Sequence, residues 1–269
     1  MNPVIDLHNV SKEFQRKRWI SLGAEDNVVL AVDTISLRLQ SGQSVGLAGE
    51  SGCGKTTLGR LIAGLYEPTS GTISVFGQNI NAGSNHIRRQ LRRECRMIFQ
   101  NLDAALNPFM RVADIIEEPM KVHTAASKQE RKKRVIEVLE MVNLPAVFRH
   151  EYPHTLSGGE KRRVSVARAI AVPPKILIAD EPVSALDVSI RAQIIDLFQH
   201  LRNELKLTML FISHDLGVLN DVCDRLLVMY NGKIVEDAPI EKLRDRTLEH
   251  PYSNKLTESV LEVSIGSHQ

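Results

Sequence analysis

The chain has 269 residues, 43% of them hydrophobic, and a formal net charge of only +2. That length allows one large domain or two small ones with a buried core, and the balanced charge excludes the strong basic excess of many nucleic-acid binders. No stretch approaches the roughly 18 consecutive apolar residues of a membrane-spanning helix, and the first thirty residues lack the apolar segment of a signal peptide. Cys53, Cys95 and Cys223 are widely spaced, which favours reduced thiols. We therefore expect a cytosolic protein.

Two kinds of apolar pattern follow one another along the chain. The segments Val4–Val10, Val28–Leu39 and Thr72–Phe76 are β-branched and alternating, which predicts an antiparallel sheet. From Val45 onward the apolar runs are short and continuous, as in parallel strands that are covered on both faces. These runs are Val45–Ala48, Met97–Phe99, Ile176–Ala179, Met209–Ile212 and Leu226–Met229. The Asn-Gly pair in "YNGK", Tyr230–Lys233, predicts a hairpin turn after the last of them.

Helical segments separate these runs, so the fold class is α/β with a mostly parallel core sheet and an antiparallel β subdomain. Between Gln100 and Ile176 there is no strand run, only helical segments such as Ala113–Met120 and Lys128–Val142. We therefore predict one domain over residues 1–246. Its core comprises residues 1–100 and 174–246, and a helical subdomain of residues 101–173 is inserted between two strands. Residues 247–269 form a short C-terminal extension.

The stretch "GESGCGKTT" fits the pattern G-x-x-x-x-G-K-[ST]. It follows the apolar run Val45–Ala48 and precedes the helical run Leu58–Leu65, which is the context that a phosphate-binding P-loop needs. Glycines let backbone N–H groups wrap around phosphates, and the helix adds the positive end of its dipole. We expect Lys55 to reach the β and γ phosphates and Thr56 to hold magnesium. The predicted loop residues are Gly49, Glu50, Ser51, Gly52, Cys53, Gly54, Lys55, Thr56 and Thr57.

Two further segments are candidates for the binding site, one because it contains carboxylates and the other because its backbone N–H groups could bind an anion. Asp180 and Glu181 end the run Ile176–Ala179, and a buried strand delivers its last residues to the edge where ligands bind. Asp180 can hold magnesium and Glu181 can polarise the attacking water, although adjacent carboxylates also occur as solvated strand ends. "LSGGE", Leu156–Glu160, runs into the helix Lys161–Ala171 and predicts a second anion-binding nest, with an ordinary helix N-cap as the alternative.

Together with Gln100, "SALD" at Ser184–Asp187 and His214, this set resembles the ATP-binding subunit of ABC transporters in order and spacing, from Leu7 to about Leu256. The resemblance implies the ABC-ATPase fold of P-loop NTPases, with ATP and Mg²⁺ as cofactors. It implies that Gln100 senses magnesium and the membrane partner. It also implies that His214 contacts the γ-phosphate and positions Glu181; a polar strand end and a structural histidine are the alternatives for these two residues.

The resemblance also implies that two subunits sandwich two ATP molecules. The nest of Ser157, Gly158 and Gly159 would then complete the P-loop of the facing subunit. Asp187 would lie across the dimer interface, with the N-cap of the helix Val188–Leu201 as an alternative role; it could also have both roles. The sequence departs from the family pattern at Glu160, where glutamine is usual. This carboxylate suits the helix dipole but adds negative charge near a γ-phosphate.

Phe14 and Cys53 are candidates for contacts around the nucleotide. Phe14 is the candidate for stacking on adenine, with core packing as its alternative, and the insertion Gln15–Asn27 obscures the alignment there. Cys53 lies close to Lys55 and to the start of a helix. Both neighbours favour a thiolate, so we expect the pKa of Cys53 to be lowered and its reactivity raised.

Finer motifs narrow the branch of the family. The stretches "IFQNLDAALNP", "EEPM", "DEPVSALDVSIRAQIIDL", "FISHDL" and "HPYSNKL" are similar to the ATPases of dipeptide, oligopeptide and nickel uptake systems. The similarity implies an ATPase subunit that energises import of small peptides or nickel complexes from the cytoplasmic face of the inner membrane. Its partners would be a second related ATPase or another copy of this chain, two transmembrane permease subunits and, indirectly, an extracytoplasmic substrate-binding protein, but no nucleic acid.

Two other functions stay open, an exporter ATPase and a soluble ABC ATPase that acts on DNA ends or ribosomes. The second usually has a coiled-coil insertion or a second cassette, and the segment after Gln100 shows no sustained heptads. No cysteine follows Cys223, so we expect no iron–sulfur cluster. The basic stretches Ile87–Arg96 and Lys128–Arg134 are interpreted as solvated helix faces, or else as contacts to acidic lipid or a partner.

Overall fold

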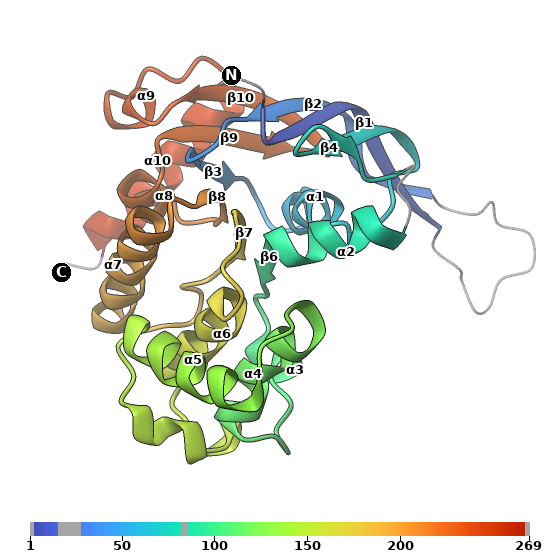
Figure 1. The fold of residues 1–269 in the computed structure, drawn as a ribbon. Helices are drawn as coiled ribbons and strands as arrows, with labels where there is room; N and C mark the ends of the chain where they lie inside the picture. Colours follow the sequence, from blue (N-terminus) through green and yellow to red (C-terminus); the bar gives the residue numbers. More distant parts are fainter. Residues whose placement is uncertain (1–2, 16–27, 82–84, 267–269) are drawn as a thin grey trace, which may run out of the picture.

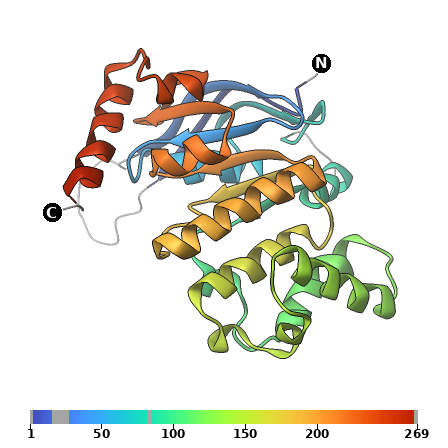
Figure 2. The same cartoon turned by 90° about the vertical axis from the view of Figure 1, so that its left-hand side faces the viewer.

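The computed structural model describes residues 3–15, 28–81 and 85–266, apart from the side chains of residues 85, 103 and 259–266. Two sheets lie at one end of the molecule and a group of helices, α3 to α6, lies at the other (Figures 1 and 2). The P-loop NTPase architecture expected from the sequence is therefore built from three parts: an antiparallel sheet, a mostly parallel sheet and the helical group.

The antiparallel sheet has the strand order β2-β1-β4-β5. Its strands are β1 (Ile5–Gln15), β2 (Val28–Leu39), β4 (Ser70–Val75) and β5 (Gln78–Asn79). The register pairs Ile5 with Leu39 and Leu7 with Leu37, and all four side chains are buried. The alternating pattern thus places one apolar face of each strand in the core, and the predicted antiparallel sheet is confirmed.

The core sheet has the strand order β10-β9-β3-β8-β7-β6. Its strands are β3 (Ser44–Ala48), β6 (Cys95–Ile98), β7 (Ile176–Asp180), β8 (Thr208–Ile212), β9 (Arg225–Tyr230) and β10 (Lys233–Pro239). All neighbours are parallel except β9 and β10, which form the hairpin predicted at "YNGK" with Tyr230 opposite Lys233. The continuous apolar runs therefore form the parallel strands that they predicted.

These runs are continuous because the core sheet is covered on both faces. In β7, Ile176 and Ile178 pack in a core with α1 and the antiparallel sheet, whereas Leu177 and Ala179 pack in the core that contains α7, α8 and the helical group. Every residue of β7 is buried. A strand in this position has no solvent face that would require alternation.

The helices of the chain have the following bounds: α1 (Lys55–Ile62), α2 (Asn85–Glu94), α3 (Leu102–Ala105), α4 (Val112–His123), α5 (Lys128–Met141), α6 (Gly158–Ile170), α7 (Val188–Leu205), α8 (Leu216–Val222), α9 (Glu241–Arg244) and α10 (Pro251–Gly266), with 3₁₀ turns η1 (Ala146–His150) and η2 (Pro153–Thr155). No strand lies between β6 and β7, as predicted. Within the described ranges, no helix has the length and apolar character required to cross a bilayer.

Helix α1 begins at Lys55, three residues before the predicted start at Leu58. Gly54 occupies the N-cap position with φ +113°, a left-handed conformation that ends the loop and starts the helix. Lys55 therefore belongs to the first helical turn. Gly59 lets α1 approach the sheet closely, because a Cβ there would lie 2.9 Å from Cδ1 of Ile212.

Candidate functional site

Four neighbouring parallel strands end at the same edge of the core sheet, and each is followed by a polar segment that the sequence singled out. The P-loop follows β3, His214 follows β8, Asp180 ends β7 with Glu181 directly after it, and Gln100 follows β6. Carboxyl ends of parallel strands are where open α/β sheets bind ligands. A cavity of about 590 Å³ at this edge is lined by Ala31, Gly49, Glu50, Ser51, Gly52, Gly54, Lys55, Thr56, Thr57, Gln100, Glu181, His214 and Leu256.

The P-loop is closed around the Lys55 side chain. Lys55 is only 7% exposed, and its Nζ donates hydrogen bonds to the carbonyl oxygens of Gly49 at 2.7 Å and Glu50 at 2.8 Å. The loop can wrap this tightly because Gly49 has φ +145° and a Cβ there would lie 2.3 Å from the carbonyl oxygen of Met229. The Lys55 ammonium therefore lies inside a loop that continues directly into the N-terminus of α1. A positive charge beside backbone N–H groups and a helix N-terminus is a geometry suited to phosphate.

Thr56 and Asp180 form a hydrogen-bonded pair beside this loop. Thr56 Oγ1 donates a hydrogen bond to Asp180 Oδ1 at 3.0 Å, and Asp180 is 1% exposed. Burial raises the pKa of Asp180, although the Thr56 hydrogen bond acts in the opposite direction. A second cavity, of about 420 Å³, contains Thr56, Gln100 and Asp180 together. Their hydroxyl, amide and carboxylate oxygens fit a hard divalent cation such as Mg²⁺.

Glu181 and His214 form a second pair. The Glu181 carboxylate lies 2.9 and 3.0 Å from Nδ1 of His214 and accepts the backbone N–H of His214 at 3.1 Å. Glu181 is buried and has φ +48°, a strained conformation for a residue with a side chain. The N–H of Glu181 donates to the carbonyl of Ile212 and so ties the strained residue to β8. This arrangement aims an acidic and a basic side chain into one cavity.

The segment Ser157–Glu160 lies elsewhere, at the start of α6. Ser157 is exposed and forms a capping box, because its Oγ accepts the Glu160 N–H while the Glu160 carboxylate accepts the Ser157 N–H at 2.8 Å and its hydroxyl at 2.7 Å. This segment does not line the P-loop cavity of its own chain. Asp187 is the N-cap residue of α7, as the N-cap alternative predicts, although its exposed side chain makes no capping hydrogen bond.

A model of the ABC transporter family matches residues 32–184 of the chain. The chain belongs to the ABC transporter family. The oligopeptide transport ATP-binding protein OppF of Bacillus subtilis is 47% identical over 234 residues, 86% of this chain and 76% of that protein. The di/tripeptide transport ATP-binding protein DppF of Pseudomonas aeruginosa is 40% identical over 256 residues, 95% of this chain and 78% of that protein.

Solved structures agree with this assignment. The dimeric ATP-binding cassette MJ0796, in a post-hydrolysis state bound to ADP and Pi, has a TM-score of 0.77 and 29% sequence identity, covering 88% of this chain and 98% of that one. The ABC-ATPase fold is therefore confirmed. As a member of this family, the chain is an ATPase that binds ATP.

Phe14, the candidate for adenine stacking, does not line the cavity of this ABC ATPase. Its ring packs edge-on against Tyr66 with centroids 5.6 Å apart, and the Lys12 ammonium lies 5.3 Å from its centroid. The ring remains 37% exposed. Its role in adenine binding therefore stays a prediction, and residues 16–27 of the neighbouring insertion lie outside the described part of the chain.

The expectation of a reactive Cys53 thiolate is wrong. The three cysteines are free and buried. Burial raises the pKa of Cys53, and this effect outweighs the opposing influence of the Lys55 ammonium, whose Nζ lies 3.8 Å from Sγ. Cys53 is not among the residues that line the cavity, and its side chain packs in the apolar core with α1 and the antiparallel sheet. The sequence shows the nearby charge but not the direction of the side chain.

Two residues of the cavity were not found from the sequence, Ala31 in β2 and Leu256 in α10. Both are small or apolar and carry no chemistry that a motif would reveal. The segment "HPYSNKL" that contains Leu256 contributed to the resemblance, but nothing in its composition indicates contact with a loop some 200 residues earlier. Only the tertiary fold brings them together.

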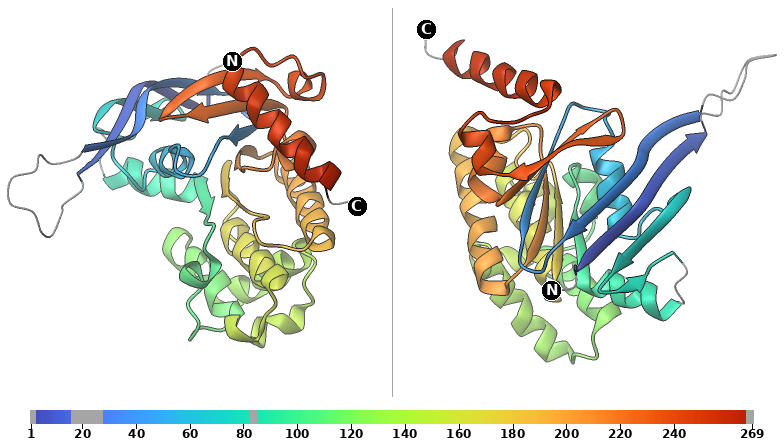
Figure 3. Two further views of the ribbon diagram at one scale, coloured as in Figure 1. Left: turned by 180° about the vertical axis from the view of Figure 1, so that it is seen from behind. Right: turned by 90° about the horizontal axis from the view of Figure 1, so that it is seen from above.

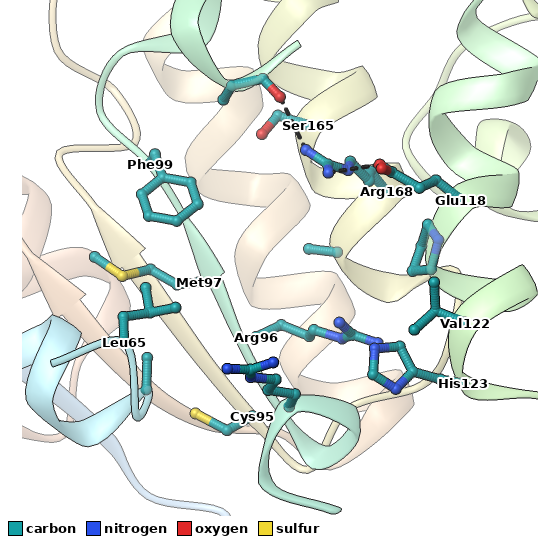
Figure 4. Close-up of a pocket in the computed structure, with 15 residues that line it drawn as sticks. Leu65, Cys95, Arg96, Met97, Phe99, Glu118, Val122, His123, Ser165 and Arg168 are labelled. Carbon is teal, nitrogen blue, oxygen red and sulfur yellow. Dashed lines mark hydrogen bonds and ion pairs between the residues drawn. The ribbon is translucent and has the colours of Figure 1, made fainter. Parts of the chain in front are cut away.

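A separate cavity of about 300 Å³ lies between the helical group and the core, where Arg92, Arg96, Glu118, His123 and Arg168 line it with apolar side chains (Figure 4). Arg168 pairs with Glu118 at 2.7 Å. The Arg96 guanidinium has buried Nε and Nη2 atoms without a hydrogen-bond partner among the described residues. Burial, together with Arg96, Arg93 and Arg92, lowers the pKa of His123. The cavity is therefore electropositive.

The buried Asp180 gives a prediction about stability. Because its pKa is raised, the folded state binds the proton more tightly than the unfolded state, and the ionised carboxylate costs stability above that pKa. Asp180→Asn keeps an oxygen for the Thr56 hydrogen bond and removes the charge. We expect its Tm at neutral pH to rise by about 2–4 °C, the shift that about 1 kcal/mol produces in a domain of this size.

Thermal unfolding without nucleotide, at pH 7.5 and pH 5, tests this expectation. The gain should shrink as the pH falls through the raised pKa, since the wild-type carboxyl then becomes neutral. Asp196→Asn, on the exposed face of α7, is the matched control and should leave Tm unchanged. A lower Tm for Asp180→Asn at neutral pH would show that the ionised form stabilises the fold.

Proposed function

We propose that this chain is the ATP-hydrolysing subunit of an importer for small peptides, with nickel complexes as the alternative cargo. The observation that carries the catalytic part is the convergence of Lys55, the Thr56–Asp180 pair and the Glu181–His214 pair on one sheet edge. The peptide assignment rests on the relatives, which are oligopeptide and di/tripeptide transport ATP-binding proteins.

Each residue of the site has a role in this proposal. Lys55 and the N–H groups of the P-loop hold the β and γ phosphates, and Thr56, Asp180 and Gln100 hold Mg²⁺. When bound, Mg²⁺ would supply positive charge that offsets the charge developing on the phosphate oxygens. Glu181 accepts a proton from the attacking water, and His214, held by the Glu181 carboxylate, faces the γ-phosphate.

We propose that catalysis requires two subunits. Ser157 and Gly158 are exposed at the N-terminus of α6, and the nest does not line the P-loop cavity of its own chain, so it is available to the γ-phosphate bound by a facing chain. The exposed Asp187 carboxylate makes no capping hydrogen bond, so it is available to a facing chain. The dimeric cassette MJ0796 supports a paired state. A second, related ATPase is the proposed partner, with another copy of this chain as the alternative.

The electropositive cavity between the core and the helical group is the proposed contact for a permease subunit. The cavity lies between β6 and helices α4 and α6 of the proposed helical subdomain, residues 101–173. Because β6 is followed by Gln100, a movement of the permease at this cavity would be transmitted to the nucleotide site. Arg96 lacks an acidic partner among the described residues, which suits an acidic side chain on a permease helix. We propose that the chain binds the permease at the cytoplasmic face of the inner membrane, with the substrate-binding protein on the other side.

Reconstitution tests the transport role. The chain, its candidate ATPase partner and two permeases are placed in liposomes with ATP inside, with the binding protein and a labelled tripeptide added outside. We expect ATP-dependent peptide uptake. The substitution Arg92→Glu, in α2 at the rim of the cavity, should lower this uptake at least about tenfold. The control substitution Arg89→Glu, on the exposed face of α2, should leave it unchanged. ATP-driven movement outward indicates an exporter, and failure to assemble with any permease indicates a soluble ABC ATPase.

A further inference from the structure

The C-terminal helix α10 is fastened to the core beside the β9–β10 hairpin, where it is drawn in red (Figure 3). Glu236 of β10 is 8% exposed, and its carboxylate accepts the backbone N–H groups of Glu249 at 3.2 Å and His250 at 2.8 Å. The Tyr252 N–H donates to Nδ1 of His250 at 3.2 Å. A buried charge therefore fixes the start of α10 and the direction of its first side chains.

Tyr252 reaches from this helix to the P-loop. Its ring packs against Tyr230 at the end of β9, with ring centroids 4.2 Å apart and planes inclined by 34°. Its hydroxyl oxygen accepts the backbone N–H of Glu50 at 3.1 Å, across a sequence separation of 202 residues. One turn further along α10, Leu256 lines the P-loop cavity. The helix thus touches the loop through a specific hydrogen bond and forms part of the cavity wall.

The Glu50 N–H, which donates to the Tyr252 hydroxyl, belongs to the same peptide unit as the Gly49 carbonyl. That carbonyl accepts the Lys55 ammonium at 2.7 Å. No peptide bond among the described residues is cis, so the C=O and N–H of this unit point in opposite directions. Lys55 therefore holds the peptide plane from inside the loop and Tyr252 holds it from outside. Gly49 has no Cβ to restrict rotation of this plane, so the two hydrogen bonds set its orientation.

We propose that Tyr252 is a positioning residue for Lys55: by fixing the Gly49–Glu50 peptide plane, it aims the lysine ammonium at the phosphates. The proposal rests on the proposed binding of ATP phosphates by Lys55. Tyr252 contacts neither the nucleotide nor the reacting atoms in this role. Its effect is transmitted through one carbonyl oxygen, so it must disappear when the lysine is absent.

A double-mutant cycle measures this dependence. Tyr252→Phe keeps the ring on Tyr230 and removes only the hydroxyl. We expect the Kd for ATP with Mg²⁺, measured by titration calorimetry, to rise about fivefold, the effect of losing one hydrogen bond. In the Lys55→Ala background the same substitution should change Kd by less than about 1.5-fold. Tyr230→Phe, which removes the hydroxyl of the stacked neighbour, is the matched control and should bind ATP like the wild type.

Two results would overturn the proposal. One is an unchanged Kd for Tyr252→Phe in the wild-type background. The other is an equal loss in both backgrounds, because a general loosening of the loop or of α10 does not depend on Lys55. Failure of the proposed role of Lys55 would look different: Lys55→Ala alone would bind ATP as tightly as the unmodified chain, whatever the identity of residue 252.

Discussion

Replacing Lys55 with Ala is expected to lower ATP turnover at least about 100-fold while the protein remains folded. The lysine supplies a charge-assisted contact to the β and γ phosphates, and loss of a single preorganised charge contact costs about this much. In the structure Lys55 is buried and donates to two loop carbonyls. The fold should nevertheless survive, because these contacts are local and removing the charge also removes its desolvation cost.

Turnover is measured as phosphate release by the assembled ATPase pair, with circular dichroism as the check on folding. Lys133→Ala, whose side chain is 82% exposed on α5, is the matched control and should keep full activity. Near-normal turnover by the folded Lys55→Ala protein would remove the P-loop assignment. Equal loss in the Lys133 control would show that the effect is not specific to the phosphate site.

Changing Glu181 to Gln is expected to slow hydrolysis by about 10²- to 10⁴-fold and to leave ATP binding nearly unchanged. The amide keeps the size of the side chain and an oxygen that accepts the His214 N–H, but it cannot take a proton from water. Single-turnover hydrolysis separates this defect from binding, since bound ATP should persist. Glu204→Gln, exposed on α7, controls for loss of charge and should hydrolyse ATP at the wild-type rate.

The parts of the fold that could be predicted from the sequence are those in which a local residue pattern is explained by a single physical cause, such as burial of both faces of a strand. The run Ile176–Ala179 is continuous because both faces of β7 are buried, so strand type and position followed directly. Asp180, Glu181 and His214 could be placed together because each follows a parallel strand, and parallel strands end at one edge. Their hydrogen bonds were not predictable, since they depend on side-chain directions.

Other features depend on contacts that no local pattern encodes. The direction of the Cys53 side chain decides whether the charge of Lys55 or burial controls the thiol, and burial has the larger effect. The hydrogen bond between Glu50 and Tyr252 joins residues that are 202 positions apart in the chain. The start of α1 at Lys55 depends on the left-handed Gly54 rather than on apolar periodicity, which begins only at Leu58.

Glu160 bears on the proposed pairing of subunits. Its carboxylate accepts both the N–H and the hydroxyl of Ser157, so the serine hydroxyl proton is engaged within its own chain. A facing γ-phosphate would meet the free N–H groups at the start of α6 together with this nearby negative charge. The proposed nest is thus built with a carboxylate where the family usually has an amide.

The mass of the Glu181→Gln protein in solution, with ATP and magnesium, tests the nucleotide sandwich most directly. Unhydrolysed ATP should contact Lys55 of one chain and the Ser157 nest of the other, so we predict a stable two-subunit species. This species should form more readily with the related ATPase than with a second copy of this chain. It should vanish with ADP, or when the exposed Ser157 is replaced by Arg. A monomer under every condition, with the partner ATPase present, would contradict the sandwich.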